Sequence, residues 1–277
     1  MGVKRNLDCL LDPRCDQHAY FLGLLATDGT ISENTRNRGR VTFELGISDA
    51  RILADLAREV PYRATLHERC RTTNFSANYR SGILSFFDLG LRRGLADLGY
   101  CAGRKSATVA PPRGPYNEIG FWRGVVDGDG SLGTIADGRP YASLITASQT
   151  LRDQYVDFVF RTTGSRPNPS RNRRDNVFNI VVYAEAAQQL ASTLYTPGAI
   201  AIERKARAAE TIKRWRRPGW QRRVTFERRR WLPSEDQILN ECDSISILAE
   251  KLGRTVKSVN IRRWRLRSKL TSQRREH

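Results

Sequence analysis

Residues 20–30 read YFLGLLATDGT, and residues 121–131 read FWRGVVDGDGS. Both stretches are apolar and helix-like, with a glycine, a small residue four positions later, and then an Asp-Gly pair. The matching positions are Gly23, Thr27, Asp28 and Gly29 in the first stretch, and Gly124, Gly128, Asp129 and Gly130 in the second. Two copies of one pattern indicate an internal repeat, which predicts further landmarks in the same register.

Two more landmarks recur at the same spacing of about 100 residues. The strand-like VTFELGIS at 41–48 has a counterpart in ASLITAS at 142–148. The sequence GRKSA around Lys105 has a counterpart in ERKAR around Lys205. Three landmarks in constant register indicate a tandem duplication.

Each repeat reads as helix, strand pair, helix, strand pair, helix. In 41–48 apolar residues alternate with polar ones, which is typical of a half-buried strand. We therefore expect an α+β fold of two αββαββα repeats, over 1–113 and 114–214. Further elements are expected as helices at 49–60, 86–98, 150–160 and 183–194, and as a strand at 176–184.

The formal net charge of +18 and the pI near 10.4 indicate a polyanionic partner, because binding to phosphates releases counterions. Of the 47 basic residues only seven are lysine. Before residue 213 these are Lys4, Lys105 and Lys205. Arginine serves wherever planar phosphate contacts suffice, so the two interior lysines are conspicuous.

No apolar run approaches the roughly 18 residues of a membrane span, and the N-terminus lacks the apolar centre of a signal peptide. We expect a soluble protein of the cytoplasm, nucleoid or an organelle matrix, with no membrane partner. The five cysteines are scattered, so neither disulfides nor a zinc site are expected. The sets Cys9, Cys15 and His18, or His67 and Cys70, are the weak exceptions.

Residues 215–229 form a basic stretch interrupted by Pro218 and Gly219, and are expected to be a linker. It either lies on phosphates or serves as a solvated tether. The following segment, 230–277, predicts a small all-α module with two short helices separated by Gly253, the signature of a helix-turn-helix.

This segment resembles Myb/SANT-type helix-turn-helix domains over about forty residues, with Leu232 where a capping Thr is usual. Its expected core consists of Trp231, Ile238, Leu248, Leu252, Val259 and Trp264. The residues expected to contact DNA are Lys257, Asn260 and Arg263.

Small residues spaced by four lie on one face of a helix, so the two motif helices can approach each other closely. Asp28 and Asp129 would then emerge side by side at two helix C-termini, where their charges repel. A divalent cation relieves that repulsion, and oxygen ligands suit Mg²⁺. Asp127 has Ala26 as its counterpart in the first repeat, so we expect it to be structural or a remnant of the motif. A basic chain with an acidic metal site suits phosphodiester hydrolysis.

The two stretches resemble the paired motifs of single-chain LAGLIDADG homing endonucleases, over roughly residues 18–214. The resemblance implies a saddle whose antiparallel sheets enter DNA major grooves, with the acids over the minor groove. It implies Mg²⁺ as cofactor, with Mn²⁺ or Ca²⁺ as substitutes and Ca²⁺ without cleavage. The implied metal ligands are Asp28, Asp129 and the carbonyls of Thr27 and Gly128.

The resemblance also places a lysine and a polar residue near the attacking water. Lys105 and Lys205 fit the lysine position. The alternative is that both are ordinary surface lysines at the start of a helix. Gln149 fits the polar position, which Asp49 occupies in the first repeat. The candidates for reading DNA on the sheets are Arg38, Arg40, Thr42, Glu44, Arg71, Thr73, Asn78, Arg80, Ser143, Arg171, Arg173 and Asn179.

The sequence thus favours a monomeric, site-specific, double-strand DNA endonuclease of a mobile genetic element. Two alternatives stay open. One is a non-catalytic DNA-binding regulator that joins a degenerate LAGLIDADG fold to a helix-turn-helix, although such proteins lose the acids. The other is an RNA maturase, which the added helix-turn-helix disfavours.

Overall fold

The computed structural model describes residues 11–35, 38–73, 76–103, 105–172, 174–219, 231–241 and 244–273. The chain divides into two compact units, Met1–Gly219 and Trp220–His277, called here the first unit and the C-terminal unit. Each is described by itself.

The first unit contains two αββαββα repeats in succession, as the duplicated sequence predicts. The first repeat consists of α1 (Asp16–Thr27), β1 (Gly29–Ile31), β2 (Val41–Gly46), α2 (Arg51–Glu59), β3 (Ala64–Thr73), β4 (Ser76–Phe86) and α3 (Leu89–Asp97). The second consists of α4 (Glu118–Asp129), β5 (Gly130–Thr134), β6 (Pro140–Thr146), α5 (Gln149–Thr163), β7 (Ser170–Asn172), β8 (Val177–Tyr183) and α6 (Ala184–Leu194). A further helix, α7 (Glu203–Lys213), follows the second repeat.

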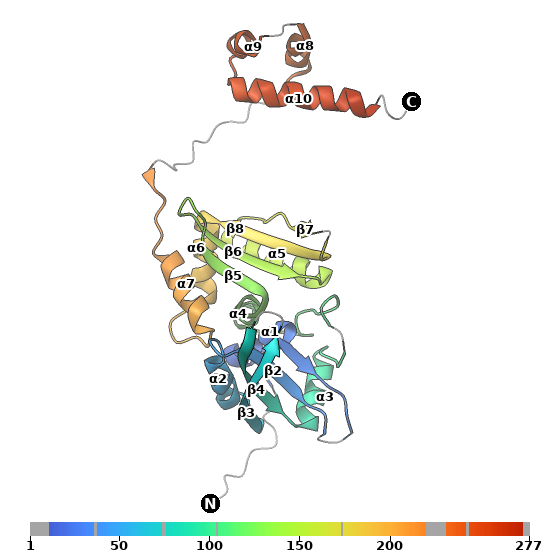
Figure 1. The fold of residues 1–277 in the computed structure, drawn as a ribbon, viewed down its shortest axis with the longest axis vertical. Coiled ribbons are helices and arrows are strands. Elements are labelled where there is room, and N and C mark those ends of the chain that lie inside the picture. Colours follow the sequence, from blue (N-terminus) through green and yellow to red (C-terminus); the bar gives the residue numbers. More distant parts are fainter. Residues whose placement is uncertain are drawn as a thin grey trace, which may run out of the picture. The chain divides into compact units, whose positions relative to one another are not determined.

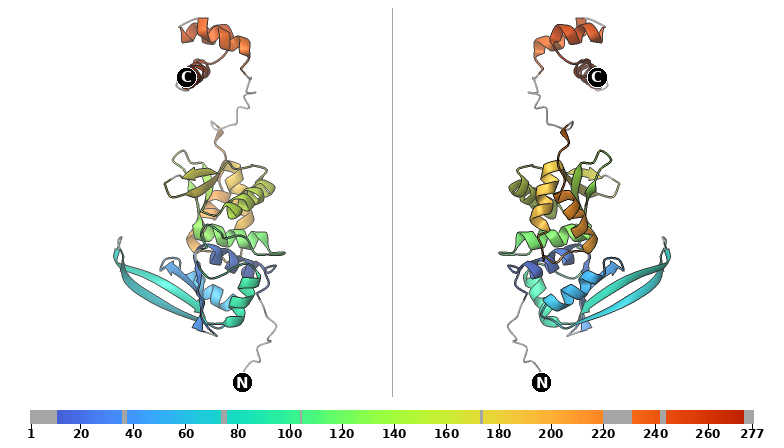
Figure 2. Two further views of the ribbon diagram at one scale, coloured as in Figure 1. Left: turned by 90° about the vertical axis from the view of Figure 1, so that its right-hand side faces the viewer. Right: turned by 90° about the vertical axis from the view of Figure 1, so that its left-hand side faces the viewer.

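Each repeat forms one antiparallel four-stranded sheet, in the orders β1-β2-β4-β3 and β5-β6-β8-β7. Figure 1 shows α1 and α4 next to each other, with one sheet on either side. Figure 2 shows that the hairpin of β3 and β4 reaches well beyond the rest of its sheet. The same arrangement in both halves gives the first unit an approximate internal symmetry.

Alternation of side chains decides which face of each sheet is buried. In β2, Val41, Phe43 and Leu45 are buried, whereas the residues between them are only half-buried. In β6, Ala142 and Leu144 are buried in the same way. Because side chains alternate along a strand, each sheet packs one face against the helices and leaves the other open. We call the latter the open face.

The glycines of the two motifs allow α1 and α4 to touch through their backbones. A Cβ atom at Gly23 would collide with the carbonyl oxygen of Phe121, and one at Gly124 would collide with that of Tyr20. The close approach predicted from the small residues is confirmed. The helices are enclosed by apolar neighbours, so the crossing lies in the core.

Several helix boundaries differ from the prediction by one to three residues, the start of α3 among them. The helix expected to begin at Phe86 begins at Leu89, and Phe86 is the last residue of β4. The cause is local, since the Asp88 side chain accepts a hydrogen bond of 2.8 Å from the backbone N–H of Leu91 and so caps the helix there.

The C-terminal unit contains three helices within its described residues: α8 (Pro233–Glu241), α9 (Ile245–Leu252) and α10 (Val256–Gln273). Gly253 ends α9 with a φ of 57°, as the break in the sequence pattern predicts. The buried core consists of Leu239, Leu248, Ala249, Leu252 and Val259.

Trp264 does not belong to this core, contrary to the prediction, because 68% of it is exposed. The aromatic contribution comes from Trp231, which packs against the core and carries the guanidinium of Arg254 over its ring at 4.0 Å. Arg254 in turn forms a buried ion pair of 2.8 Å with Glu235.

Within the described residues, no helix has the length and apolar character needed to cross a membrane.

Candidate active site

The two motif aspartates lie at the same end of the helix crossing. Asp28 caps the C-terminus of α1, and Asp129 is the last residue of α4. Each is followed at once by the first residue of a strand, Gly29 in β1 and Gly130 in β5. At Gly128, a Cβ atom would come within 2.8 Å of Oδ2 of Asp28, so that carboxyl group lies directly against the second motif. The structure therefore brings the two acids together.

Both carboxyl groups are held in a state that disfavours their negative charge. Partial enclosure by the protein, together with the neighbouring Asp28 carboxylate, raises the pKa of Asp129 to about 6. Enclosure also raises the pKa of Asp28. The ammonium groups of Lys205 and Lys105 act in the opposite direction on both acids without cancelling the effect.

These features fit a small divalent cation. No hydrogen bond or salt bridge between the described residues engages either carboxylate, so both are available as ligands. Among the described residues, no three or more His, Cys, Asp or Glu side chains are placed so that they could hold a metal ion together. Two carboxylates with the remaining positions left to water, backbone carbonyls and substrate oxygens suit Mg²⁺ better than Zn²⁺. The carbonyls of Thr27 and Gly128 are the nearest backbone candidates by sequence.

The alternative cysteine and histidine sets do not form such a site. Nδ1 of His18 accepts a hydrogen bond of 3.1 Å from the Asp12 N–H, and its Nε2 lies 3.3 Å from the Glu59 carbonyl oxygen, which occupies both ring nitrogens. His67 and Cys70 are three residues apart in β3, so they point to opposite faces of the sheet. Cys9 lies outside the described residues.

The two predicted lysines both reach the ends of the motif helices, but in unequal ways. Lys205, at the start of α7, is 3% exposed and donates hydrogen bonds of 2.7, 2.6 and 2.8 Å to the carbonyls of Val126, Asp127 and Gly130. All three protons of its ammonium group are thus engaged. Burial lowers the pKa of Lys205.

Lys105 lies in a turn rather than a helix, and it is half-buried. Its ammonium group donates to the carbonyl of Leu25, the counterpart of Val126. Enclosure lowers the pKa of Lys105 to about 8, although Asp28 and Asp129 oppose this effect. Lys105 therefore retains protons to donate and can exchange one near neutral pH, whereas Lys205 holds the backbone around Asp129.

Asp127 has a structural role, as its unmatched counterpart Ala26 led us to expect. It is 1% exposed and accepts hydrogen bonds of 2.7 Å from each of the Tyr20 and Tyr195 hydroxyls and of 2.6 Å from the Ile202 N–H. Three donors satisfy the buried carboxyl group, so it is not available to a cation or substrate.

Asp49 and Gln149 also differ in their surroundings. Asp49 is engaged by Arg204 of α7, whose Nε lies 2.9 Å from both carboxylate oxygens. This ion pair joins the first repeat to the end of the second, and the Asp49 side chain is only 13% exposed. Gln149 is the first residue of α5 and is exposed. Sequence reasoning missed Arg204, although it directly precedes the conspicuous Lys205.

The strand register separates the DNA-reading candidates of the first sheet into two groups. Thr42, Glu44 and Arg71 share the open face, and Arg38 and Arg40 lie exposed in the segment before β2. Arg80 belongs to the opposite face, where it pairs with Glu68 at 2.5 Å, and Asn78 has the same parity. Thr73 lies beyond a register shift in the β3–β4 hairpin.

In the second sheet, Ser143 and Asn179 lie on the open face. Arg171 lies on the helix-facing side, with its guanidinium 5.7 Å from the centre of the Phe178 ring. Arg173 falls outside the described residues. In the C-terminal unit, Lys257 and Asn260 are exposed on α10. Arg263 is only 8% exposed, so it is less accessible to DNA than Lys257 and Asn260.

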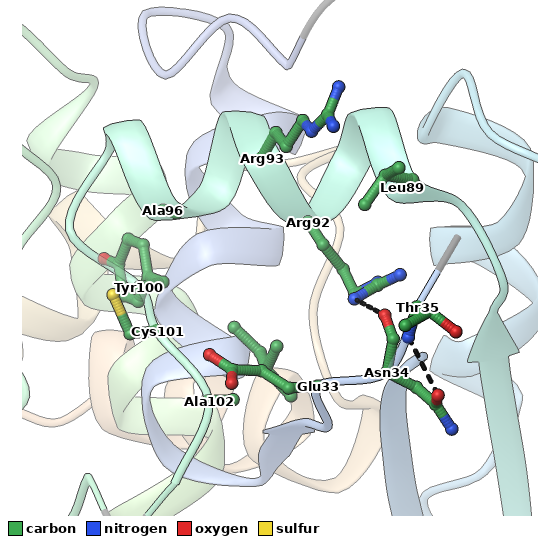
Figure 3. A pocket seen from close by; sticks show the side chains of 11 residues that line it. Glu33, Asn34, Thr35, Leu89, Arg92, Arg93, Ala96, Tyr100, Cys101 and Ala102 are labelled. Atoms are coloured by element: carbon green, nitrogen blue, oxygen red, sulfur yellow. Dashed lines mark hydrogen bonds between the residues drawn. The ribbon is translucent and has the colours of Figure 1, made fainter. Parts of the chain in front are cut away.

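A sizeable cavity of the first unit is lined by other residues. It has a volume of about 540 Å³, and its wall consists of residues of 31–35, α3 and 100–102 (Figure 3). None of the residues predicted from the sequence belongs to this wall, and Nη1 of Arg92 donates a hydrogen bond of 3.2 Å to the carbonyl of Asn34 there. The candidate active-site residues therefore lie outside this pocket.

No protein-family model matches the chain, and no curated protein is similar to it. Among solved structures, it is similar to the homing endonuclease I-WcaI bound to its DNA recognition sequence, with a TM-score of 0.50 and 14% identity over 72% of this chain and 87% of that one. It is also similar to I-DmoI in complex with DNA and Ca (TM-score 0.47, 16% identity, 71% of this chain and 97% of that one). A third is the N-terminal LAGLIDADG domain of WhiA (TM-score 0.44, 11% identity, 70% and 92%).

The similarity to I-WcaI shows that the first unit has the LAGLIDADG fold. The two antiparallel four-stranded sheets around a crossed helix pair are the arrangement that the paired motifs predicted. The fold prediction is therefore confirmed for this unit.

Proposed function

We propose that the chain is a site-specific DNA endonuclease that hydrolyses both strands of a long target with a divalent metal. The observation that carries the proposal is the pair of carboxylates, Asp28 and Asp129, that no described residue engages at the adjoining ends of α1 and α4. A bound cation would polarise the scissile phosphate and lower the pKa of an attacking water. The similar structure I-WcaI is a homing endonuclease bound to its DNA recognition sequence, which supports the proposal.

The residues of the chain have distinct parts in this proposal. Asp28 and Asp129 hold Mg²⁺, or Mn²⁺ in its place, with the carbonyls of Thr27 and Gly128 as further ligands. Lys105 supplies a mobile proton and a positive charge next to the acids, while Lys205 fixes the backbone that carries Asp129. Because one chain contains both halves of the site, it acts as a monomer.

The C-terminal unit is proposed to be a helix-turn-helix that adds contacts to duplex DNA. Lys257 and Asn260 are exposed on α10, the helix that follows the turn at Gly253. If Lys257 contacts a phosphate, Lys257→Gln in the full chain should weaken binding and reduce the slope of log affinity against log salt by about 1, without affecting cleavage at saturating protein.

Cleavage assays with the purified chain test the proposal. The target would be selected from random duplexes in Ca²⁺, and the selected duplex then treated with Mg²⁺ or Mn²⁺. We expect cleavage of both strands by the native chain, and binding without cleavage by Asp28→Asn and Asp129→Asn. Asp157→Asn, an exposed acid of α5 paired with Arg166, is the matched control and should cleave normally.

Tight binding without nicking in either metal would favour the non-catalytic regulator and overturn the nuclease proposal. Selection of RNA in preference to duplex DNA would favour the maturase.

A further inference from the structure

The open faces of the two sheets differ in chemistry more than a tandem duplication suggests. On the first sheet the register aligns alternate residues of β2, β3 and β4 on this face. The polar and charged members are Thr42, Glu44, Thr65, His67, Arg69, Arg71, Tyr79, Ser81 and Ser85. Sequence reasoning missed Arg69, although it stands two residues before Arg71 in the same strand.

Glu44 holds the two arginines of this face in place. Its Oε1 accepts a hydrogen bond of 2.7 Å from the Ser81 hydroxyl and lies 3.3 Å from a guanidinium nitrogen of Arg71, while its Oε2 lies 3.9 Å from one of Arg69. The Arg71 guanidinium also stacks 5.6 Å from the centre of the Tyr79 ring. The side chains of Arg69 and Arg71 are 50% and 42% exposed, so they are oriented yet accessible.

The open face of the second sheet contains no charged residue among the described positions of β5 to β8. Its members are Ser131, Gly133, Tyr141, Ser143, Ile145, Ser170, Asn172, Val177, Asn179, Val181 and Tyr183. Ile145 and Tyr183 are 48% and 47% exposed, and the Tyr141 ring lies across Gly133, where a Cβ atom would be 3.1 Å from it. The side-chain oxygen of Asn179, the cross-strand neighbour of Ile145, accepts no hydrogen bond from the described residues.

Several observations identify DNA as the occupant of this second face. The open face of the second sheet lies next to the candidate metal-binding carboxylates, because β5 begins directly after Asp129. Arginines border it without lying on it: Arg139 precedes β6, and Arg174, whose side chain is 91% exposed, lies in the turn before β8. Only two large apolar side chains of this face, Ile145 and Tyr183, are exposed, and these are too few for a stable protein interface. A basic rim around an apolar floor suits a duplex whose phosphates meet the rim and whose bases meet the floor.

We infer that the target has two chemically different halves: a guanine-bearing half read by Arg69 and Arg71, and a thymine-rich half read by Ile145, Val181 and Tyr183. The inference rests on the proposed function. Arginine pairs with O6 and N7 of guanine, whereas apolar side chains contact the thymine methyl group, and Asn pairs with adenine. Because no charged side chain lies on the second face among the described strand residues, bases are distinguished there chiefly by methyl groups.

Modified bases test the inference with the full chain. After selection of a target in Ca²⁺, deoxyuridine would replace thymine in one half at a time, which removes only the methyl group. In separate duplexes 7-deazaguanine would replace guanine, which removes only the N7 acceptor. We expect each lost methyl contact to lower affinity about threefold to fivefold in one half only, and each lost N7 contact about tenfold in the other.

Variants assign each half to its sheet. Ile145→Ser should reduce the sensitivity to deoxyuridine and keep the sensitivity to 7-deazaguanine, and Arg71→Gln should do the reverse. Leu66→Ser is the matched control, because Leu66 is 50% exposed but lies on the helix-facing side of β3, and it should change neither.

The outcomes separate the two proposals. If no DNA sequence is selected, or none is cleaved in Mg²⁺, the proposed function fails. If a target is selected and cleaved but both halves respond equally to deoxyuridine, or Ile145→Ser leaves that response intact, only the inference about the halves is overturned. A shift of the native chain from dimer to monomer on Ile145→Ser, without a change in deoxyuridine sensitivity, would assign the face to a second copy instead.

Discussion

Replacing Asp129 by asparagine should make the metal-free protein more stable at neutral pH, because it removes one of two carboxylates that repel each other. In the folded state the pKa of Asp129 is raised from 3.8 to about 6 by enclosure and by the Asp28 carboxylate. At neutral pH the fold must therefore hold a charge that it disfavours. The amide of asparagine has nearly the same shape and carries no charge.

The size of the expected gain in unfolding free energy follows from the shift in the pKa of Asp129. Each factor of ten in proton affinity is worth about 1.4 kcal/mol, so the change from 3.8 to about 6 corresponds to ~3 kcal/mol at most. The enclosure of Asp129 is only partial, and solvent screening reduces this to ~1 kcal/mol. In a unit of this size that amounts to about 2–4 °C in the melting temperature.

The pH dependence gives the prediction its sign. Since the folded pKa is above the unfolded one, the folded state binds more protons between about pH 4 and pH 6, and the contribution of Asp129 to stability falls as pH rises through this window. The neutral amide of the Asp129→Asn variant undergoes no such loss. The variant and the native chain should therefore be equally stable near pH 4 and differ by the full amount above pH 6.

Urea unfolding followed by circular dichroism in EDTA, at a series of pH values, measures the difference. Millimolar Mg²⁺ should stabilise the native chain more than the variant, since a ligand stabilises the state that binds it. Asp137→Asn is the control, because the Arg139 N–H lowers the pKa of Asp137 and its replacement should not stabilise the fold. A variant less stable than the native chain at neutral pH without metal would refute the reasoning.

Three further predictions test other parts of the structure. Gly124→Ala should lower the unfolding free energy by several kcal/mol, because the new methyl group would collide with the backbone of α1. Gly94→Ala in α3 is its control, since the new methyl group meets nothing within 4 Å and should stabilise the fold by ~1 kcal/mol. Equal shifts of the melting temperature would contradict the close packing of α1 against α4. Lys205→Met should lower the unfolding free energy by about 3 kcal/mol, because three carbonyl groups lose their hydrogen-bond donor. Lys105→Met should leave the melting temperature nearly unchanged and reduce the rate of DNA cleavage. The reverse pattern would exchange the roles of the two lysines. Arg254→Met should destabilise the C-terminal unit by about 3 kcal/mol or more, because it leaves the buried carboxylate of Glu235 without its ion-pair partner. Amide hydrogen exchange should become faster in the C-terminal unit and stay unchanged in the first unit.

The order and type of the elements in the first unit could be predicted because the sequence contains them twice. Where one copy is ambiguous, the other supplies the register, as with the strands 41–48 and 142–148. The glycines of the motifs could also be interpreted from spacing alone, since only closely crossed helices require small residues four apart on one face. The proximity of Asp28 and Asp129 could be predicted for the same reason, because each aspartate lies at the end of one of the two crossed helices.

The faces of the long hairpin could not be predicted in the same way. Whether Arg71 or Arg80 reaches the open face depends on the pairing of β3 with β4, and the register shifts between Arg71 and Thr73. A shift of one residue moves every side chain to the other face. Nothing local in the sequence marks this irregularity. In the C-terminal unit, the sequence pattern predicts Trp264 in the core, but Trp264 is 68% exposed and the core contains Leu239 instead.

The lysines show why a repeated sequence does not ensure a repeated site. Lys105 and Lys205 stand in similar sequences, yet only Lys205 is followed by a long helix, α7, which carries it into the protein. The same helix presents Arg204 to Asp49, so α7 binds the end of the second motif helix and the first repeat at once. The half that contains Asp129 is therefore fixed by buried hydrogen bonds. In the half that contains Asp28, Lys105 lies in a turn, and its ammonium group still has protons that it can donate. The symmetry lies in the backbone that positions the acids, and the asymmetry lies in the groups that surround them.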